Sequence, residues 1–201
     1  MLAEQNIISQ NSVIQSLSCP YPKRPSEVYD LGLSINYLNL SIFQDIIVLC
    51  KNTNSVEIIN KIISFEKSEE QKLFKDYLFL LNIELGDFYY SGGLKISNSV
   101  DETEIEFIKP LIDQNLENLY LKVNKIKNDL SINSFASRSN GISELNYKDV
   151  FETCMSIREN ISVLYHELYK IYPHGRVRDT FMELAIFTQE GSMKLRKICT
   201  N

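Results

Sequence analysis

Two stretches of the chain decide its fold: Ser41-Ile42-Phe43-Gln44-Asp45-Ile46 and Ser156-Ile157-Arg158-Glu159-Asn160-Ile161. Each stretch is followed by a second apolar run, which carries Phe65-Glu66-Lys67-Ser68-Glu69 in the first case and Phe187-Thr188-Gln189-Glu190-Gly191 in the second. An internal repeat of this kind indicates a duplicated structural unit. Because both runs have the apolar spacing of helices, the repeat predicts two helix hairpins that pack together as a bundle.

The rest of the chain has the same helical spacing. Apolar residues recur three and four positions apart, and no sustained alternation of period two is present. The sequence therefore predicts an all-α protein with helices at about residues 29–51, 55–90, 103–130, 147–172 and 176–199. The predicted inward line of the third helix is Phe107, Leu111, Leu116, Leu119, Val123, Ile126 and Leu130. The predicted inward line of the fifth helix is Phe181, Leu184, Ala185, Thr188, Gly191, Ser192, Leu195 and Ile198. Residues 1–30 hold three of the five prolines and are predicted to form an N-terminal arm, followed by a single bundle domain at residues 31–201. A loop is predicted at residues 133–141, which are rich in serine and asparagine.

The composition argues against several classes of partner. The 201 residues are 44% hydrophobic and carry a formal net charge of −5, whereas a nucleic-acid-binding protein normally has a basic face. No run approaches the roughly 20 apolar residues that a membrane span needs, and no signal peptide is visible. Four widely spaced cysteines without a CxxC pair fit a reducing compartment. The sequence predicts a cytoplasmic protein with no nucleic-acid partner and no membrane span.

Two carboxylates fall on the apolar line of the second predicted helix. That line runs in steps of three and four through Ile59, Ile62, Glu66, Glu69, Leu73, Tyr77 and Leu80. Burying unpaired carboxylates is costly, so on this interpretation Glu66 and Glu69 must be paired, protonated or bound to a cation. In the alternative, the buried face is rotated towards Ile58 and Phe65, and both glutamates lie in water at the rim.

The fourth and fifth predicted helices carry the other candidate positions. Glu159 and His166 share one face of the fourth helix, from which both could reach a metal in the core of a bundle. The alternative is that His166 lies at the surface and is hydrogen-bonded to a neighbour. In the fifth helix, Thr188 and Gly191 correspond to Glu66 and Glu69. Small residues there predict close helix packing or space for a ligand.

This pattern resembles the ferritin-like superfamily and, within it, the rubrerythrin-like branch. The likeness lies in segments 34–85 and 158–195 of the chain. It implies an up-down bundle of two helix hairpins with a long crossover, here with an extra central helix at about residues 103–130. In that family, a glutamate on the first helix of each hairpin and a Glu-x-x-His on the second bind two irons.

Only part of the family's ligand pattern is present. Glu159 matches the first-helix glutamate of the second hairpin, whereas Gln44 stands at the equivalent place in the first. Glu66 matches the glutamate of Glu-x-x-His, and Glu69 stands where the histidine is expected. With His166 as a substitute, the resemblance implies the metal ligands Glu66, Glu69, Glu159 and His166, and iron or manganese as the cofactor if the site is intact.

Three functions are compatible with these features, and the sequence leaves open whether the chain is an enzyme. The first is a non-catalytic bundle that binds a protein partner or forms a homo-oligomer, with its excess apolar residues on one exposed face and the arm as docking element. The second is a divergent di-metal carboxylate protein, that is, an oxidase, peroxidase or iron-binding protein. The third is a pocket for an apolar or aromatic ligand, lined by some of the eleven tyrosines and ten phenylalanines. No phosphate-binding loop, dinucleotide fingerprint or hydrolase motif is present.

Overall fold

The computed structural model describes residues 17–50, 53–90, 99–139 and 147–200 of the chain. In these ranges the backbone forms five helices and no strand, so the all-α prediction is confirmed. The helices are α2 (Pro25–Leu49), α3 (Thr53–Tyr90), α4 (Glu102–Ser139), α5 (Tyr147–Ile171) and α6 (Arg176–Thr200).

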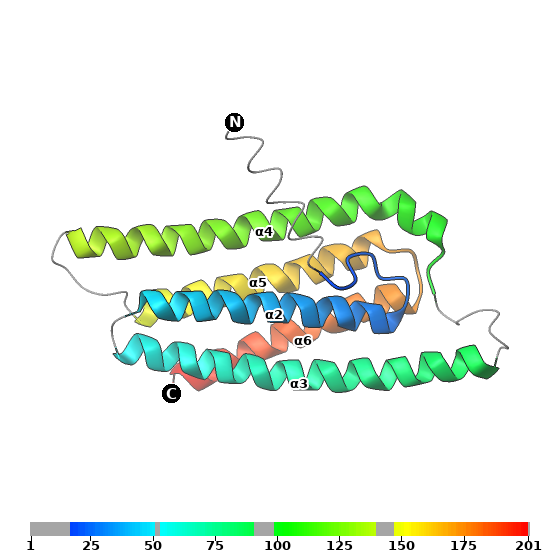
Figure 1. Ribbon diagram of the computed structural model, residues 1–201, viewed down its shortest axis with the longest axis horizontal. Helices are drawn as coiled ribbons and strands as arrows, with labels where there is room; N and C mark the ends of the chain where they lie inside the picture. The colour runs from blue at the N-terminus through cyan, green and yellow to red at the C-terminus, as the bar shows by residue number, and fades with distance from the viewer. Residues whose placement is uncertain (1–16, 51–52, 91–98, 140–146, 201) are drawn as a thin grey trace.

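The helices form a four-helix bundle with a fifth helix on one side. α2 packs most extensively against α3, and α5 packs most extensively against α6, so each pair forms one hairpin of the repeat. The two hairpins are neighbours, because α3 packs against α5 and α2 against α6. α4 packs against α5 and α2 but not against α3 or α6, which places this additional helix at the edge of the bundle (Figure 1). Successive helices run in opposite directions, and α4 returns the chain along the length of the bundle, so that α3 and α5 run in the same direction (Figure 1).

Two helix boundaries differ from the prediction. α2 begins at Pro25, about four residues earlier than expected, because proline is well tolerated at the first position of a helix. α4 continues to Ser139 and includes most of the loop expected at residues 133–141, because a helix that has already been nucleated extends through serine and asparagine at little cost. The ends of α3, α5 and α6 lie within two residues of the expected positions. The arm residues 1–16 lie outside the described residues.

The buried residues follow the predicted apolar line of each helix, except that the buried face of α4 is rotated from the predicted one. In α4, Phe107 and Leu111 were expected to face inwards but are exposed. Among the described side chains of this helix, Ile105, Ile108 and Ile112 are buried in their place, together with Leu116 and Val123, which were predicted to be buried. In α6, the predicted line from Phe181 to Leu195 is buried, and only its last member, Ile198, is exposed.

The N-terminus of α2 is held by a carboxylate from α3. Glu84 is buried and accepts hydrogen bonds from the backbone N–H of Ser26, at 2.8 Å, and from its Oγ, at 2.5 Å. A carboxylate at this place satisfies a free N–H of the first helical turn and interacts favourably with the helix dipole. The C-terminal end of α3 extends past the start of α2 and α6 (Figure 1).

α2 is also the most apolar helix. Among the described residues, it is the one helix long and apolar enough to cross a membrane by length and composition. The core helix of a soluble protein meets the same criteria, and α2 contributes Val28, Leu31, Phe43 and Ile46 to the core. The membrane and localisation expectations stay predictions.

Candidate functional site

The two glutamates of α3 lie inside the bundle. Glu66 and Glu69 are each 1% exposed, next to the buried Ile62 and Leu73. The first interpretation of the apolar line is therefore confirmed, and the alternative that puts both carboxylates in water is wrong. Because carboxylates buried in this way need partners, their surroundings define the candidate site.

Arg158 of α5 is the partner of Glu66. Its guanidinium forms an ion pair with Glu66 Oε1, and its side chain is 4% exposed. Arg158 Nε donates to Ser192 Oγ, and Arg158 Nη2 donates to the carbonyl oxygen of Thr188, both at 3.2 Å. The guanidinium also lies over the ring of Phe65, 5.3 Å from its centroid. The arginine therefore joins α3, α5 and α6 through one planar group.

Gly191 of α6 provides the space for this group. A Cβ at this position would overlap Arg158 Nη2 and would lie 2.8 Å from Glu69 Oε2. The small residue predicted to allow close packing or to leave space for a ligand thus makes room for two charged side chains. A larger residue at 191 would have to displace one of them.

Glu69 is only partly satisfied. Its Oε1 accepts from Lys72 Nζ at 2.6 Å, whereas its Oε2 is buried and has no hydrogen-bond partner in the described part of the chain. Glu69 lines a cavity of about 20 Å³ that is also lined by Asn36 and Asn39 of α2, whose Oδ1 atoms are likewise buried and unpartnered. A cavity of this size holds about one water molecule, and Glu69 Oε2 and Asn36 Oδ1 suit a small hydrogen-bond donor there.

The charges of the site sum to zero. Glu66 and Glu69 are balanced by Arg158 and by Lys72, whose amine is half exposed at the edge of the bundle. Burial raises the pKa of the Glu66 carboxyl, and the nearby charge of Glu69 raises it further. The charge and hydrogen bond of Arg158 and the amide of Asn36, 3.3 Å away, lower it in part.

The other two predicted ligands lie elsewhere. Glu159 and His166 line a groove on the outer side of α5 and α6, whereas Glu66 and Glu69 line the small inner cavity. Glu159 is paired with Arg196 at 2.8 Å, and His166 is exposed, with its ring stacked on Tyr169. The structure thus brings together Glu66 and Glu69 but not the full set of four.

The residues at the centre do not fit a di-iron site. Such a site needs several carboxylate and imidazole ligands around one point. Here an arginine already neutralises Glu66 and would repel a cation. Within the ranges that the structure describes, no group of three or more His, Cys, Asp or Glu side chains is arranged to hold a metal ion.

Arg158 is the central residue that the sequence interpretation missed. It lies on the buried line of α5, which runs in steps of three and four through Phe151, Cys154, Arg158, Ile161, Tyr165 and Leu168. A single basic residue on an apolar line was the signal. Because a buried arginine needs an acidic partner, this signal would have pointed to the two glutamates on the facing helix.

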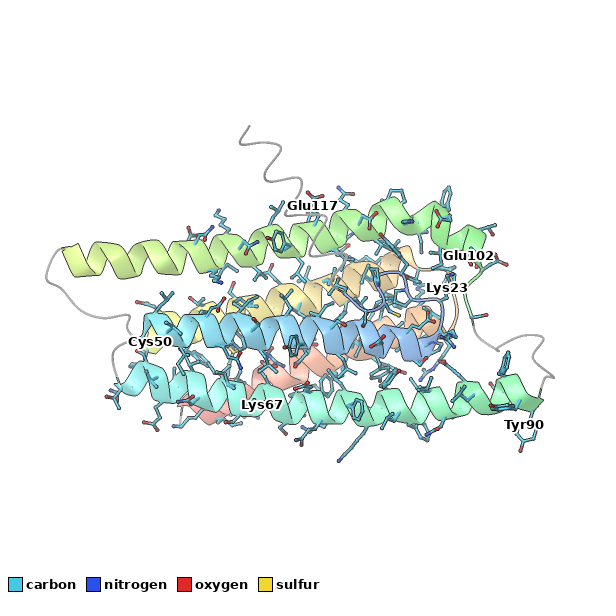
Figure 2. The ribbon with its side chains drawn as sticks, viewed as in Figure 1. Lys23, Cys50, Lys67, Tyr90, Glu102 and Glu117 are labelled. Atoms are coloured by element: carbon cyan, nitrogen blue, oxygen red, sulfur yellow. The ribbon has the colours of Figure 1, made fainter. Side chains whose placement is uncertain are left out.

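An exposed apolar face lies on the C-terminal half of α3. Phe74, Leu78, Leu81, Leu85 and Phe88, here called the α3 stripe, are spaced by four, three, four and three residues. Leu81 is half-buried, and the other four are between 41% and 49% exposed. Other large side chains in this half of α3 are also exposed, at Phe79, Ile83, Tyr89 and Tyr90, the last of which ends the helix in Figure 2.

Comparisons with known proteins do not assign the chain to a family. No protein-family model matches it, and neither a curated protein nor a solved structure gives a significant match.

Proposed function

We propose that this chain is a non-catalytic helical-bundle protein that works by binding another protein chain. We also propose that its bundle has the ferritin-like arrangement without a complete di-iron site. The two hairpins, and the crossover that makes α3 and α5 parallel, support this arrangement. The guanidinium of Arg158 next to Glu66 supports a structural role for the charges in the core.

The α3 stripe is the observation that carries the binding role. Contiguous exposed apolar surface of this kind marks sites of protein interaction. The stretch from Phe74 to Tyr90 carries four charged residues, at Lys75, Asp76, Glu84 and Asp87, and Glu84 is buried against Ser26. The exposed face is therefore apolar and poor in charge, as the centre of an interface usually is.

The occupant that fits the α3 stripe best is a second copy of the same chain. A spacing of four and three residues is that of the contact positions of paired helices, whose side chains interlock with an identical set. Two copies related by a twofold axis would bring the same stripe of each chain into contact. The stripe spans the 15 residues from Phe74 to Phe88, which corresponds to a contact about 20 Å long.

The oligomeric state of the whole chain tests this proposal. We expect a dimer in sedimentation experiments at micromolar concentration, and a monomer of unchanged helix content for the double variant Leu78→Glu/Leu85→Glu. The control is Val163→Glu, which replaces a side chain of similar exposure, 49%, on α5. A monomeric wild type, or a control variant that dissociates like the double variant, would refute the proposal.

One observation favours the alternative, a divergent di-metal carboxylate protein. Two carboxylates are buried near each other, and Glu69 Oε2 has no hydrogen-bond partner among the described residues. Protein purified without chelator and analysed for metals separates the two functions. We expect iron and manganese far below one ion per chain, and near-stoichiometric metal would support the alternative.

A further inference from the structure

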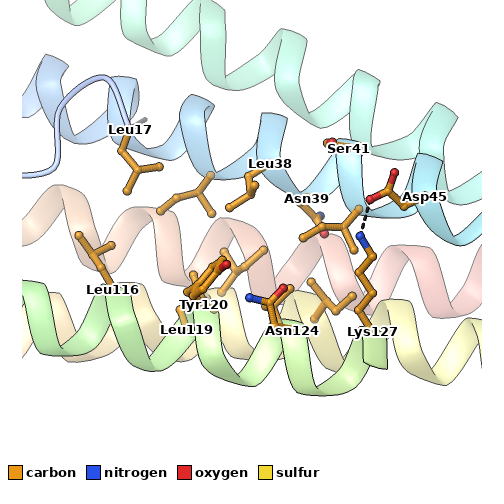
Figure 3. A pocket seen from close by; sticks show the side chains of 15 residues that line it. Leu17, Leu38, Asn39, Ser41, Asp45, Leu116, Leu119, Tyr120, Asn124 and Lys127 are labelled. Carbon is orange, nitrogen blue, oxygen red and sulfur yellow. Dashed lines mark hydrogen bonds and ion pairs between the residues drawn. The ribbon is translucent and has the colours of Figure 1, made fainter. Parts of the chain in front are cut away.

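A cavity separates α2 from α4 on the side of the molecule where the bundle has its additional helix. Its volume is about 180 Å³, and it is lined by residues of α2, α4 and α5 and by Leu17, which precedes α2. Figure 3 shows Leu38 of α2 facing Leu119 and Tyr120 of α4 across the space. The α3 stripe lies on other residues, so the cavity is independent of the proposed dimer surface.

The walls of the cavity are mostly apolar. The lining includes Leu17, Ile35, Leu38, Ile42, Leu116, Leu119, Val123, Ile157 and Ile161. An apolar cavity of similar size in another protein, about 150 Å³, stays dry and binds benzene. The walls and volume therefore suit a ligand with one aromatic ring or two fused rings.

One buried polar atom gives the cavity a preference for a hydrogen-bond donor. Asn39 is 3% exposed and lines this cavity as well as the small cavity beside Glu69, and its Oδ1 has no partner in the described part of the chain. A buried acceptor without a partner is costly, so a ligand that donates one hydrogen bond to it gains over a ligand that cannot.

The charged residues of the lining do not call for a charged ligand. Asp45 of α2 and Lys127 of α4 form an ion pair that bridges the two helices at one end of the cavity, opposite Leu17 (Figure 3). Each charge has its counter-ion in this pair, and the remaining polar groups of the lining are uncharged. This charge balance favours a neutral ligand.

We propose that the α2–α4 cavity binds a small neutral aromatic molecule that carries one N–H or O–H donor. The ring lies between the apolar side chains of α2, α4 and α5, and the donor binds Asn39 Oδ1. Binding at this place joins α4 more firmly to the bundle.

Indole and indene are suitable probes because they have the same shape and differ in a single N–H. We expect indole to shift the NMR signals of the cavity residues in a saturable manner, with a dissociation constant of about 1 mM or tighter. Indene should bind about fivefold more weakly, which is the effect of one net hydrogen bond. In Asn39→Leu, the difference between the two probes should disappear.

Two further variants locate the site. Val123→Phe fills the cavity from α4 and should abolish indole binding, whereas Leu121→Phe adds the same ring to an exposed position of that helix and should leave it unchanged. If Val123→Phe does not fold, nuclear Overhauser effects from the indole ring to the methyl groups of Val123 and Leu116 in the wild type decide the location. Absence of saturable binding, or binding that persists in folded Val123→Phe, would overturn the proposal, as would equal affinity for both probes.

Discussion

Replacement of Arg158 by methionine tests the role of the charges in the core. The variant keeps most of the side-chain volume but removes the ion pair with Glu66. Glu66 then retains the amide of Asn36, 3.3 Å away, as its hydrogen-bond donor, although it is 1% exposed. Breaking a buried pair by removing one partner costs about 3–5 kcal/mol, because the remaining charge is not compensated.

The loss should be visible in urea unfolding followed by circular dichroism. With a slope of about 2–3 kcal/mol/M, the midpoint of Arg158→Met should fall by about 1–2.5 M. Burial already raises the pKa of Glu66, and removal of Arg158 raises it further. When a carboxyl has a higher pKa in the folded than in the unfolded protein, the free energy of unfolding falls as pH rises through the folded-state pKa. The defect should therefore be larger at about pH 7 than at about pH 5.

A double variant provides the control. Glu66→Leu/Arg158→Met replaces both charges by apolar groups and should be more stable than Arg158→Met alone, since no uncompensated charge is left at these two positions. The reasoning is refuted if Arg158→Met unfolds at the wild-type midpoint, or if the double variant loses the sum of the two single losses.

Three further predictions concern other parts of the fold. Gly191→Ala should destabilise the protein by about 1–3 kcal/mol in urea unfolding although alanine favours helices, because the new Cβ overlaps the guanidinium of Arg158; unchanged or higher stability would contradict this. Glu84→Gln should lower the free energy of unfolding by about 1–2 kcal/mol, since a charged acceptor at the N-terminus of α2 becomes neutral while Ser26 stays in place. A loss of stability that disappears in high salt would instead indicate a surface effect. Cys154 is buried, and burial raises the pKa of its thiol, so iodoacetamide should modify it only when the protein unfolds. Peptide mapping with and without urea would show this, and rapid labelling of the native protein would contradict the buried position of Cys154.

The sequence was sufficient for the helices and for part of the site. Spacing alone predicted five helices, because each has a continuous apolar line that the bundle buries. The same spacing allowed two positions for Glu66 and Glu69, on the inner line of α3 or at its rim, and the burial of both side chains decides for the first. Periodicity alone does not identify the buried face of a helix when two faces have similar hydropathy. In α4 it predicted that Phe107 and Leu111 are buried, whereas Ile108 and Ile112 are buried instead.

The partner of the glutamates was missed for another reason. The family pattern calls for a carboxylate on α5 and so directs attention to Glu159, whereas Arg158 is the residue on the apolar line of that helix. One residue corresponds to a rotation of about 100°, so the choice decides which side chain enters the core and which meets water. The packing of α5 against both α3 and α6 shows that Arg158 faces the core, and that packing depends on contacts between distant parts of the sequence.

The ion pair of Glu66 and Arg158 also limits how the two hairpins can align. Apolar lines with steps of three and four can interlock in more than one register, since sliding by a turn, about 5.4 Å, exchanges one aliphatic contact for another. Such a slide would separate the carboxylate from the guanidinium, and both charges would then be buried among apolar side chains without a partner. The ion pair therefore specifies the register of the helices. It adds little net stability but makes every shifted arrangement of the helices costly.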